Sequence, residues 1–211
     1  MTELFISAFI TLFVVIDPPG CAPIYAGLTK EASDQERRSM AIRAVVIATA
    51  ILLVFALFGE ALLGALHIEL DAFRIAGGLM LFLIALDMVF EKRTQRREQR
   101  AERILAESEG KPETEDVSVF PMAMPMLAGP GAITSVMLLN AKAEGLEDSL
   151  VVLGALAAVL LLTLAALLAA APLMRLAGKR AEAVITRLLG VLLAALATQF
   201  VINGLRGSFG V

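Results

Sequence analysis

The chain has 211 residues, of which 58 % are apolar and 18 % are charged, with a mean hydropathy of +0.81 and a formal net charge of −3. A soluble domain is about 45–50 % apolar and about 25 % charged, so this composition indicates a membrane protein. One cysteine, Cys21, excludes an intramolecular disulfide, and one histidine, His67, excludes a metal site built from several His and Cys ligands.

Six apolar runs are long enough to cross a bilayer, which takes roughly 20 mostly apolar residues. No Lys or Arg precedes the first run and no small-residue cleavage site follows it, so we interpret it as a retained helix rather than a secretory signal. The sequence therefore predicts an all-α membrane protein with six transmembrane helices. They are expected at about residues 4–29, 44–66, 72–90, 117–141, 150–172 and 188–205.

The first run is interrupted near its centre by Asp17-Pro18-Pro19-Gly20, and Asp17 is its only charged residue. Proline ends a helix, and backbone groups freed inside hydrocarbon are costly unless protein or water satisfies them. An acid at mid-membrane usually faces an internal polar pathway. Asp17 could bind a substrate ammonium group, a coupling proton or Na⁺, or it could only cap the half-helix that follows. The break could also be a packing kink that holds no ligand.

A charged stretch from Lys92 to Asp116 is the only long hydrophilic segment. Its first part could continue the third helix, and we expect the remainder to be a solvated linker on the cytoplasmic side. The interleaved acids and the absence of aromatic residues argue against nucleic-acid binding. This linker, residues 92–117, divides the chain into a first three-helix half, residues 1–91, and a second, residues 118–211.

The fourth run is uncharged and is interrupted by Ala128-Gly129-Pro130-Gly131. No acidic side chain accompanies this break, so any ligand contact there would come from backbone groups. Thr134 and Ser135 follow it, and their hydroxyl groups could contact a ligand or bond to their own helix backbone. In the sixth run, the polar Gln199 and Asn203 need partners, either on another helix or on a substrate.

The distribution of basic residues predicts the orientation in the membrane. If the N-terminus lies outside, the cytoplasmic side receives all but three of the 18 Lys and Arg residues, and the outer side receives only Arg74, Lys142 and Arg206. The positive-inside rule therefore predicts that both termini lie outside.

The two halves share a layout. Each begins with a span broken by Pro and Gly, and the third spans open on Arg74-Ile75-Ala76-Gly77 and Arg187-Leu188-Leu189-Gly190. Three spans per half turn the second half upside down, which predicts an inverted repeat. At 1.5 Å per residue, the two breaks lie about 20 Å from opposite faces and could meet at mid-membrane. The free ends of half-helices there suit a carboxylate or a small zwitterion.

The chain resembles the MarC family, which includes the small neutral amino acid transporters of the SnatA type. The matching strings are Asp17-Pro18-Pro19-Gly20-Cys21-Ala22-Pro23-Ile24, the stretch from Phe120 to Thr134, Phe73-Arg74-Ile75-Ala76-Gly77-Gly78-Leu79, and Ala197-Thr198-Gln199-Phe200. The resemblance implies six spans with the first and fourth broken, in the inner membrane of a bacterium or archaeon, and transport of amino acids such as alanine or glycine.

The resemblance also implies that the substrate is held at the two breaks. Many family members have Asn at the position of Cys21, so this departure removes an amide donor and acceptor from the implied site. The fold is therefore implied more securely than the substrate. The implied binding residues are Asp17, Pro18, Pro19, Gly20, Cys21, Ala128, Gly129, Pro130, Gly131, Thr134 and Ser135.

No nucleotide-binding loop, zinc-protease motif or serine-hydrolase motif occurs in the sequence. We therefore expect no enzymatic activity, no cofactor and no metal, and a gradient of H⁺ or Na⁺ as the driving force. The preferred hypothesis is a secondary transporter that works by alternating access, with a small solute and the lipid bilayer as partners. Direction, coupling ion and oligomeric state are left open. The alternatives are an exporter of another small solute and a non-transporting membrane scaffold.

Overall fold

The computed structural model describes residues 1–90 and 116–210, with the side chains of residue 171 and residues 173–183 left out. All regular elements of this part are helical, which confirms the all-α prediction. The predicted linker, residues 92–117, lies outside the described residues except for its last two. The helices are α1 (Thr2–Ile16), α2 (Pro18–Leu28), α3 (Asp34–Ala65), α4 (Leu70–Val89), η1 (Ser118–Leu127), α6 (Pro130–Asn140), α7 (Leu146–Leu168) and α8 (Ala170–Phe209).

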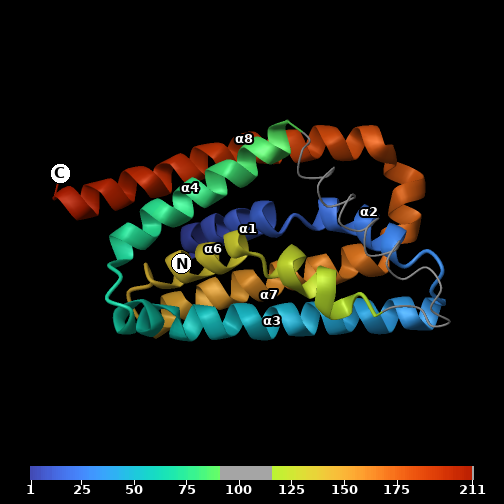
Figure 1. Ribbon diagram of the computed structural model, residues 1–211, viewed down its shortest axis with the longest axis horizontal. Coiled ribbons are helices and arrows are strands. Elements are labelled where there is room, and N and C mark those ends of the chain that lie inside the picture. Colours follow the sequence, from blue (N-terminus) through green and yellow to red (C-terminus); the bar gives the residue numbers. More distant parts are fainter. Residues whose placement is uncertain (91–115, 211) are drawn as a thin grey trace.

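The helices lie roughly along one long axis, with the connecting turns gathered at its two ends and both termini at the same end (Figure 1). By length and composition, five helical segments can cross a membrane, and α1 with α2 counts as one of them. The pair of η1 and α6 adds a sixth, bent by 53° at its break. The chain is therefore a multi-pass membrane protein with five to six spans among the described residues.

Two helices extend well beyond the apolar runs that predicted them. α3 begins ten residues earlier than expected, because Ser33 and Glu36 form a capping box at its start. The Ser33 hydroxyl accepts from the Glu36 N–H at 3.3 Å, and the Ser33 N–H donates to the Glu36 carboxylate at 2.8 Å. α8 begins at Ala170, far before the predicted residue 188. Hydropathy marks only the hydrocarbon crossing, so the predicted boundaries were too short. The capping box accounts for the start of α3, whereas no side chain caps the start of α8.

The first half of the fourth span is not a regular helix. In η1, Phe120 and Met124 have extended backbone, with φ near −130° and ψ near 125°. Each of them precedes a proline, Pro121 or Pro125, and a residue before proline is pushed out of the helical region. The prediction placed the break at residues 128–131, and it was too short, since the irregular backbone begins at Phe120, eight residues before Ala128.

Helices of the two halves run in opposite directions along the long axis (Figure 1). α1 and α2 run one way and η1 and α6 the other, and the same opposition holds for α3 with α7 and for α4 with α8. The starting residues also correspond. α2 begins at 18 and α6 at 130, and α3 begins at 34 and α7 at 146, an offset of 112 in both pairs.

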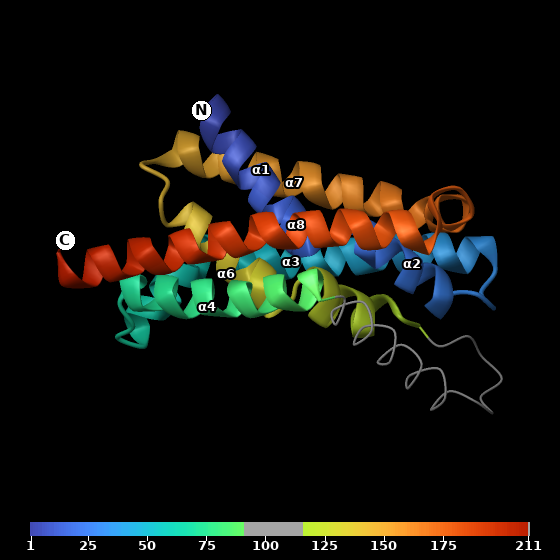
Figure 2. The same cartoon turned by 90° about the horizontal axis from the view of Figure 1, so that it is seen from above.

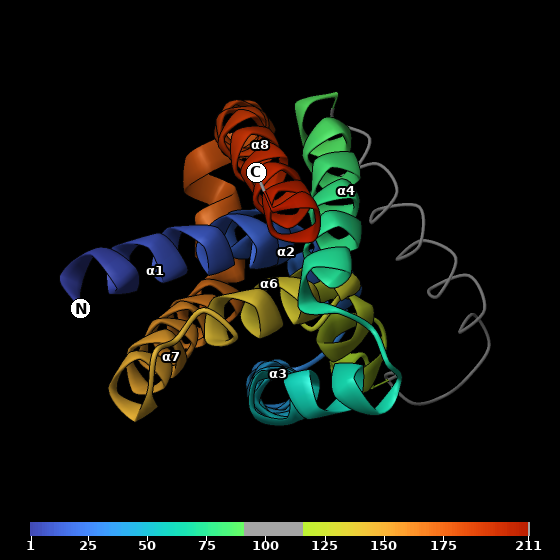
Figure 3. The same ribbon diagram turned by 90° about the vertical axis from the view of Figure 1, so that its left-hand side faces the viewer.

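The short half-helices α2 and α6 lie among the long helices. Seen down the long axis, α6 and α2 lie between α3 and α7 on one side and α4 and α8 on the other (Figure 3). Large apolar side chains that remain exposed, such as Phe58, Leu83 and Leu188 at 63 % each, project from the long helices α3, α4 and α8. Such side chains suit contact with lipid. α1 and η1 also expose apolar side chains, such as Ile6 at 51 % and Phe120 at 55 %, so α2 and α6 are the more enclosed halves of the broken spans (Figure 3).

α4 and α8 pack side by side over most of α4 (Figure 2). A small residue lets the two backbones approach at the middle of this seam. A Cβ atom on Gly78 would lie 2.8 Å from the Ala197 carbonyl oxygen and 3.0 Å from the Val201 nitrogen. These are backbone atoms and cannot rotate away, so alanine at this position would force the helices apart.

We expect Gly78→Ala to lower the stability of the protein by about 1–3 kcal/mol, through overpacking of the α4–α8 seam. The measurement is the apparent Tm in detergent. The matched control is Gly154→Ala on α7, where a new Cβ would meet nothing within 4 Å. Since alanine favours a helix over glycine, the control is expected to be neutral or stabilising. Equal Tm changes in both variants would contradict the tight seam.

Candidate functional site

The first break is made by a single residue, Asp17. Its backbone is left-handed, with φ 58° and ψ 63°, while the residues on both sides are helical. Its N–H donates to the Phe13 carbonyl at 2.9 Å and so closes the last turn of α1. Its carboxylate accepts from the Gly20 N–H at 3.2 Å and so caps the first turn of α2. Asp17 therefore ends one helix and starts the next while only 2 % exposed.

The residues after Asp17 form the first turn of α2 and leave room for the carboxylate. Pro18 stands at the first helical position, where a missing N–H costs nothing. A Cβ atom on Gly20 would overlap the Asp17 carboxylate, so a larger residue there would displace the cap. Cys21 is fully buried, and its Sγ lies 3.4 Å from the Ile16 carbonyl oxygen. The capping role proposed for Asp17 is thus present, and ligand or ion binding by the same carboxylate stays a prediction.

The second break lies at Ala128 and Gly129. The Ala128 N–H donates to the Ala123 carbonyl at 2.9 Å, and Gly129 precedes Pro130, which again stands at the first helical position. Here no side chain caps the helix start. The next two residues, Gly131 and Ala132, are buried. Pro130 itself is exposed, so the start of α6 is buried only in part, and it lacks the acid found at α2.

The two breaks lie close together near the middle of the long axis (Figure 1). A Cβ atom on Gly131 would lie 3.3 Å from Val15 Cγ1, 3.4 Å from Leu81 Cδ2 and 2.7 Å from Ile84 Cδ1. Val15 precedes Asp17 by two residues, and Gly131 follows Gly129 by two residues. The structure thus brings both breaks to one place, with α4 as a third wall.

The two hydroxyl residues beyond the second break differ in their surroundings. Thr134 is 5 % exposed, and its methyl group packs where Gly77 of α4 has no side chain. Ser135 is fully buried, and its Oγ has no hydrogen-bond partner among the described residues. Of the two expected alternatives, bonding to its own helix is therefore not observed for Ser135. A buried hydroxyl without a partner is unusual and points to a role for an additional group.

Other polar residues proved to have structural partners. Gln199 donates to Asn203 within α8 at 2.8 Å, so this hydrogen bond is made within one helix and not between helices, and contact of the pair with substrate stays a prediction. Asn140, which the sequence analysis missed, donates to the Ala56 carbonyl of α3 at 2.8 Å and ties down the end of α6. Its position in an apolar run was the available signal, because a buried amide needs a partner.

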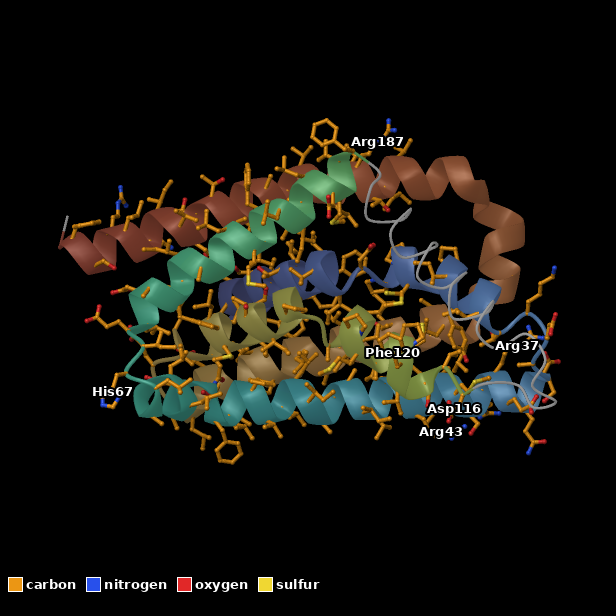
Figure 4. The ribbon with its side chains drawn as sticks, viewed as in Figure 1. Arg37, Arg43, His67, Asp116, Phe120 and Arg187 are labelled. Carbon is orange, nitrogen blue, oxygen red and sulfur yellow. The ribbon has the colours of Figure 1, made fainter. Side chains whose placement is uncertain are left out.

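A salt bridge anchors the chain where it enters η1. Arg43 of α3 and Asp116 lie 2.7 Å apart, and both face the same end of the molecule (Figure 4). Burial alone would raise the pKa of Asp116, but the hydrogen bonds from Ser118 and the charge of Arg43 outweigh it and lower that pKa. As for metals, residues 1–90 and 116–210 contain no group of three or more His, Cys, Asp or Glu side chains that could hold an ion.

Comparison with known proteins identifies the family. The model of the MarC family of integral membrane proteins matches residues 2–209. The chain belongs to the MarC family. This confirms the family resemblance, and the match covers both breaks. No solved structure matches the chain.

Relatives occur in archaea and bacteria. UPF0056 membrane protein MJ1677 of Methanocaldococcus jannaschii is 39 % identical over 98 % of both chains. UPF0056 membrane protein YvbG of Bacillus subtilis is 34 % identical over the whole of this chain and 98 % of its own length. UPF0056 inner membrane protein YhgN of Escherichia coli is 32 % identical over 98 % of both chains. These names describe membrane proteins and state no substrate.

Two substitutions separate the capping role of Asp17 from its charge. Asp17→Ala removes the cap and places a residue with no local hydrogen bond in a left-handed conformation, so we expect a loss of about 1–2 kcal/mol. Asp17→Asn keeps a capping oxygen and a residue that tolerates this conformation, so its stability is expected to stay close to wild type. Apparent Tm in detergent measures both. A large loss in Asp17→Asn would show that the negative charge itself holds the fold together.

The Arg43–Asp116 pair predicts an acid-sensitive contribution to stability. The pKa of Asp116 is lower in the folded than in the unfolded protein, so the contribution is full above the unfolded pKa of about 3.9. It is lost as the pH falls through the lower folded pKa. We expect Asp116→Asn to lower Tm at neutral pH and to approach the wild-type Tm near pH 3 or below. Glu3→Gln, which changes an exposed acid of α1, is the control. A Tm difference between Asp116→Asn and wild type that stays constant at all pH values would contradict this account.

Proposed function

We propose that this MarC-family protein is a secondary transporter of small neutral amino acids such as alanine and glycine. The observation that carries the proposal is the pair of buried half-helix starts, at Asp17 and Gly129, that meet at mid-length of the molecule. In secondary transporters, broken helices near the membrane midplane form the substrate site.

The two half-helix starts are complementary in charge, as a zwitterion requires. The N-terminus of α6 carries partial positive charge and no capping side chain, so it suits the substrate carboxylate. The Asp17 carboxylate lies at the neighbouring start and suits the substrate ammonium group. The unpartnered hydroxyl of Ser135, one turn into α6, is available as a further hydrogen-bonding group. In this proposal the Asp17 carboxylate gives up part of its capping interaction when it binds the substrate or a coupling H⁺ or Na⁺.

The walls of the proposed site favour a small substrate. A methyl group added at Gly131 would collide with Ile84 Cδ1 at 2.7 Å and would lie within 3.4 Å of Val15 and Leu81. Alanine and glycine need the least displacement of these side chains. Cys21 is buried directly behind the Asp17 break, and its weakly polar thiol further favours substrates with apolar side chains.

The architecture supports alternating access by two inverted halves. The 112-residue offset, the 11-residue length shared by α2 and α6, and the opposite directions of corresponding helices all suggest an inverted repeat. Rocking of one half against the other would then expose the site to each side in turn. By the positive-inside rule, the distribution of basic residues predicts that both termini lie outside. With no ATPase motif in the sequence, an ion gradient drives the cycle.

Flux measurements in liposomes test this function. Wild-type protein is expected to move labelled alanine and glycine. Asp17→Asn, which keeps the cap, is expected to reduce flux at low substrate concentration by about tenfold or more, because a charged hydrogen-bond partner of the ammonium group is lost.

The matched control is Glu60→Gln, which neutralises an exposed acid on α3 and is expected to leave flux unchanged. Normal flux in a folded Asp17→Asn variant would remove Asp17 from binding and coupling. A thermal-shift screen separates the other functions, because a ligand that binds the folded state raises its Tm. Another solute that raises Tm while alanine and glycine do not would indicate a different exporter, and no response to any solute would indicate a scaffold.

A further inference from the structure

A cavity of about 450 Å³ lies at the end of the molecule where α2 meets α3 and α7 passes into α8. This volume is in the range of ligand pockets, about 300–1,000 Å³. Thr29, which lines the cavity, is about 18 Å along the helix axis from Asp17. The cavity is therefore separate from the two breaks, and it lies at the interface end of the spans rather than at their middle.

The lining of the cavity has a polar side and an apolar side. Thr29, Asp34, Arg37 and Arg38 form the polar side, from the end of α2 and the first turn of α3. Leu167, Leu168, Ala170 and Pro172 form the apolar side, from the end of α7 and the start of α8. Leu168 is 47 % exposed, so the apolar side continues onto the surface that meets the bilayer.

The polar side is fixed by hydrogen bonds. Arg37 Nε donates to the Ala32 carbonyl at 3.3 Å, and Arg37 Nη2 lies 3.2 Å from Asp34 Oδ1. The Tyr25 hydroxyl donates to the Arg37 carbonyl, which ties α2 to the start of α3. Figure 4 shows Arg37 at this end of the molecule, beside the end of α2. The guanidinium of Arg37 is thus held in place before any ligand arrives.

The charges of the lining favour an anion. The lining includes two arginines, Arg37 and Arg38, and one acid, Asp34, whose side chain is 99 % exposed and therefore well hydrated. Guanidinium groups bind phosphate with paired N–H donors and are weakly hydrated, which suits a membrane interface. An apolar wall beside them suits acyl chains and glycerol carbons.

We propose that this cavity binds an anionic phospholipid, with the phosphate on Arg37 and Arg38 and the glycerol and upper acyl carbons against Leu167 and Leu168. Basic pockets between membrane helices are a known setting for lipid head groups. The bound lipid joins the α2–α3 corner of the first half to the α7–α8 corner of the second. It therefore stabilises the packing of the two halves at this end, whichever solute the protein carries.

The test uses the full-length protein, stripped of lipid in a neutral detergent, with Tm measured during lipid titration. Phosphatidylglycerol is expected to raise Tm at lower concentration than phosphatidylcholine, whose headgroup has no net charge. Glycerol 3-phosphate, which has the phosphate without acyl chains, is expected to give little shift at the same concentration. Arg38→Gln is expected to weaken the phosphatidylglycerol response by roughly tenfold, as for the loss of one charged contact.

Two further variants sharpen the test. Asp34→Asn removes the competing carboxylate and is expected to strengthen phosphatidylglycerol binding, although it also breaks the pair with Arg37. Arg206→Gln, at an exposed arginine near the opposite end of the molecule, is the matched control and is expected to leave the response unchanged.

Equal responses to the two lipids, or an Arg38→Gln response equal to that of wild type, would overturn the proposal. A glycerol 3-phosphate response equal to that of the lipid would also overturn it, in favour of a soluble anion site. The result is independent of the transport assay. Selective lipid binding by a protein that moves no amino acid would support this inference and count against the proposed function.

Discussion

The structure depends on how the backbone is satisfied where two spans break inside the membrane. No water is available in hydrocarbon, so each N–H and C=O must find a partner in the protein. At the first break a single left-handed residue meets this need, since the N–H of Asp17 completes α1 and its carboxylate caps α2. At the second break Pro130 removes one donor and Ala128 bonds back to Ala123. At the first break an acidic side chain caps the helix, whereas at the second break no side chain caps the start of α6.

This asymmetry gives the breaks their chemistry. Two identical caps would present the same charge to a ligand, whereas one acid beside one positive helix start presents both signs within a short distance. The absence of a side chain at Gly131 lets α6 lie close to Val15 of α1, beside the first break. The long helices α3, α4, α7 and α8 surround them and carry most of the exposed apolar side chains, so polar groups in the middle are kept from lipid.

At the two ends of the molecule, where the spans leave the bilayer, other contacts hold the halves together. At one end the capping box of α3 and the Tyr25–Arg37 hydrogen bond fix the α2–α3 corner of the first half, and the cavity beside Arg38 is lined by both halves. The Arg43–Asp116 pair joins the start of η1 to α3 at the same end. The charged contacts of this end thus lie at the membrane interface, where water lowers the cost of burying them. Along the α4–α8 seam, the helices are held by close packing of small residues instead.

The sequence by itself determined the membrane class, the approximate spans, both breaks and the family, because hydropathy, proline and glycine act locally and hold in any tertiary context. The extent of η1 was also encoded, in Pro121 and Pro125, although the prediction did not use it. Only the tertiary structure decided that Gly131 meets Val15, that Ser135 Oγ lacks a partner, and that Arg37 and Leu168 line one cavity. These facts join residues far apart in the chain, and their distances follow from how the helices pack, which no local pattern specifies.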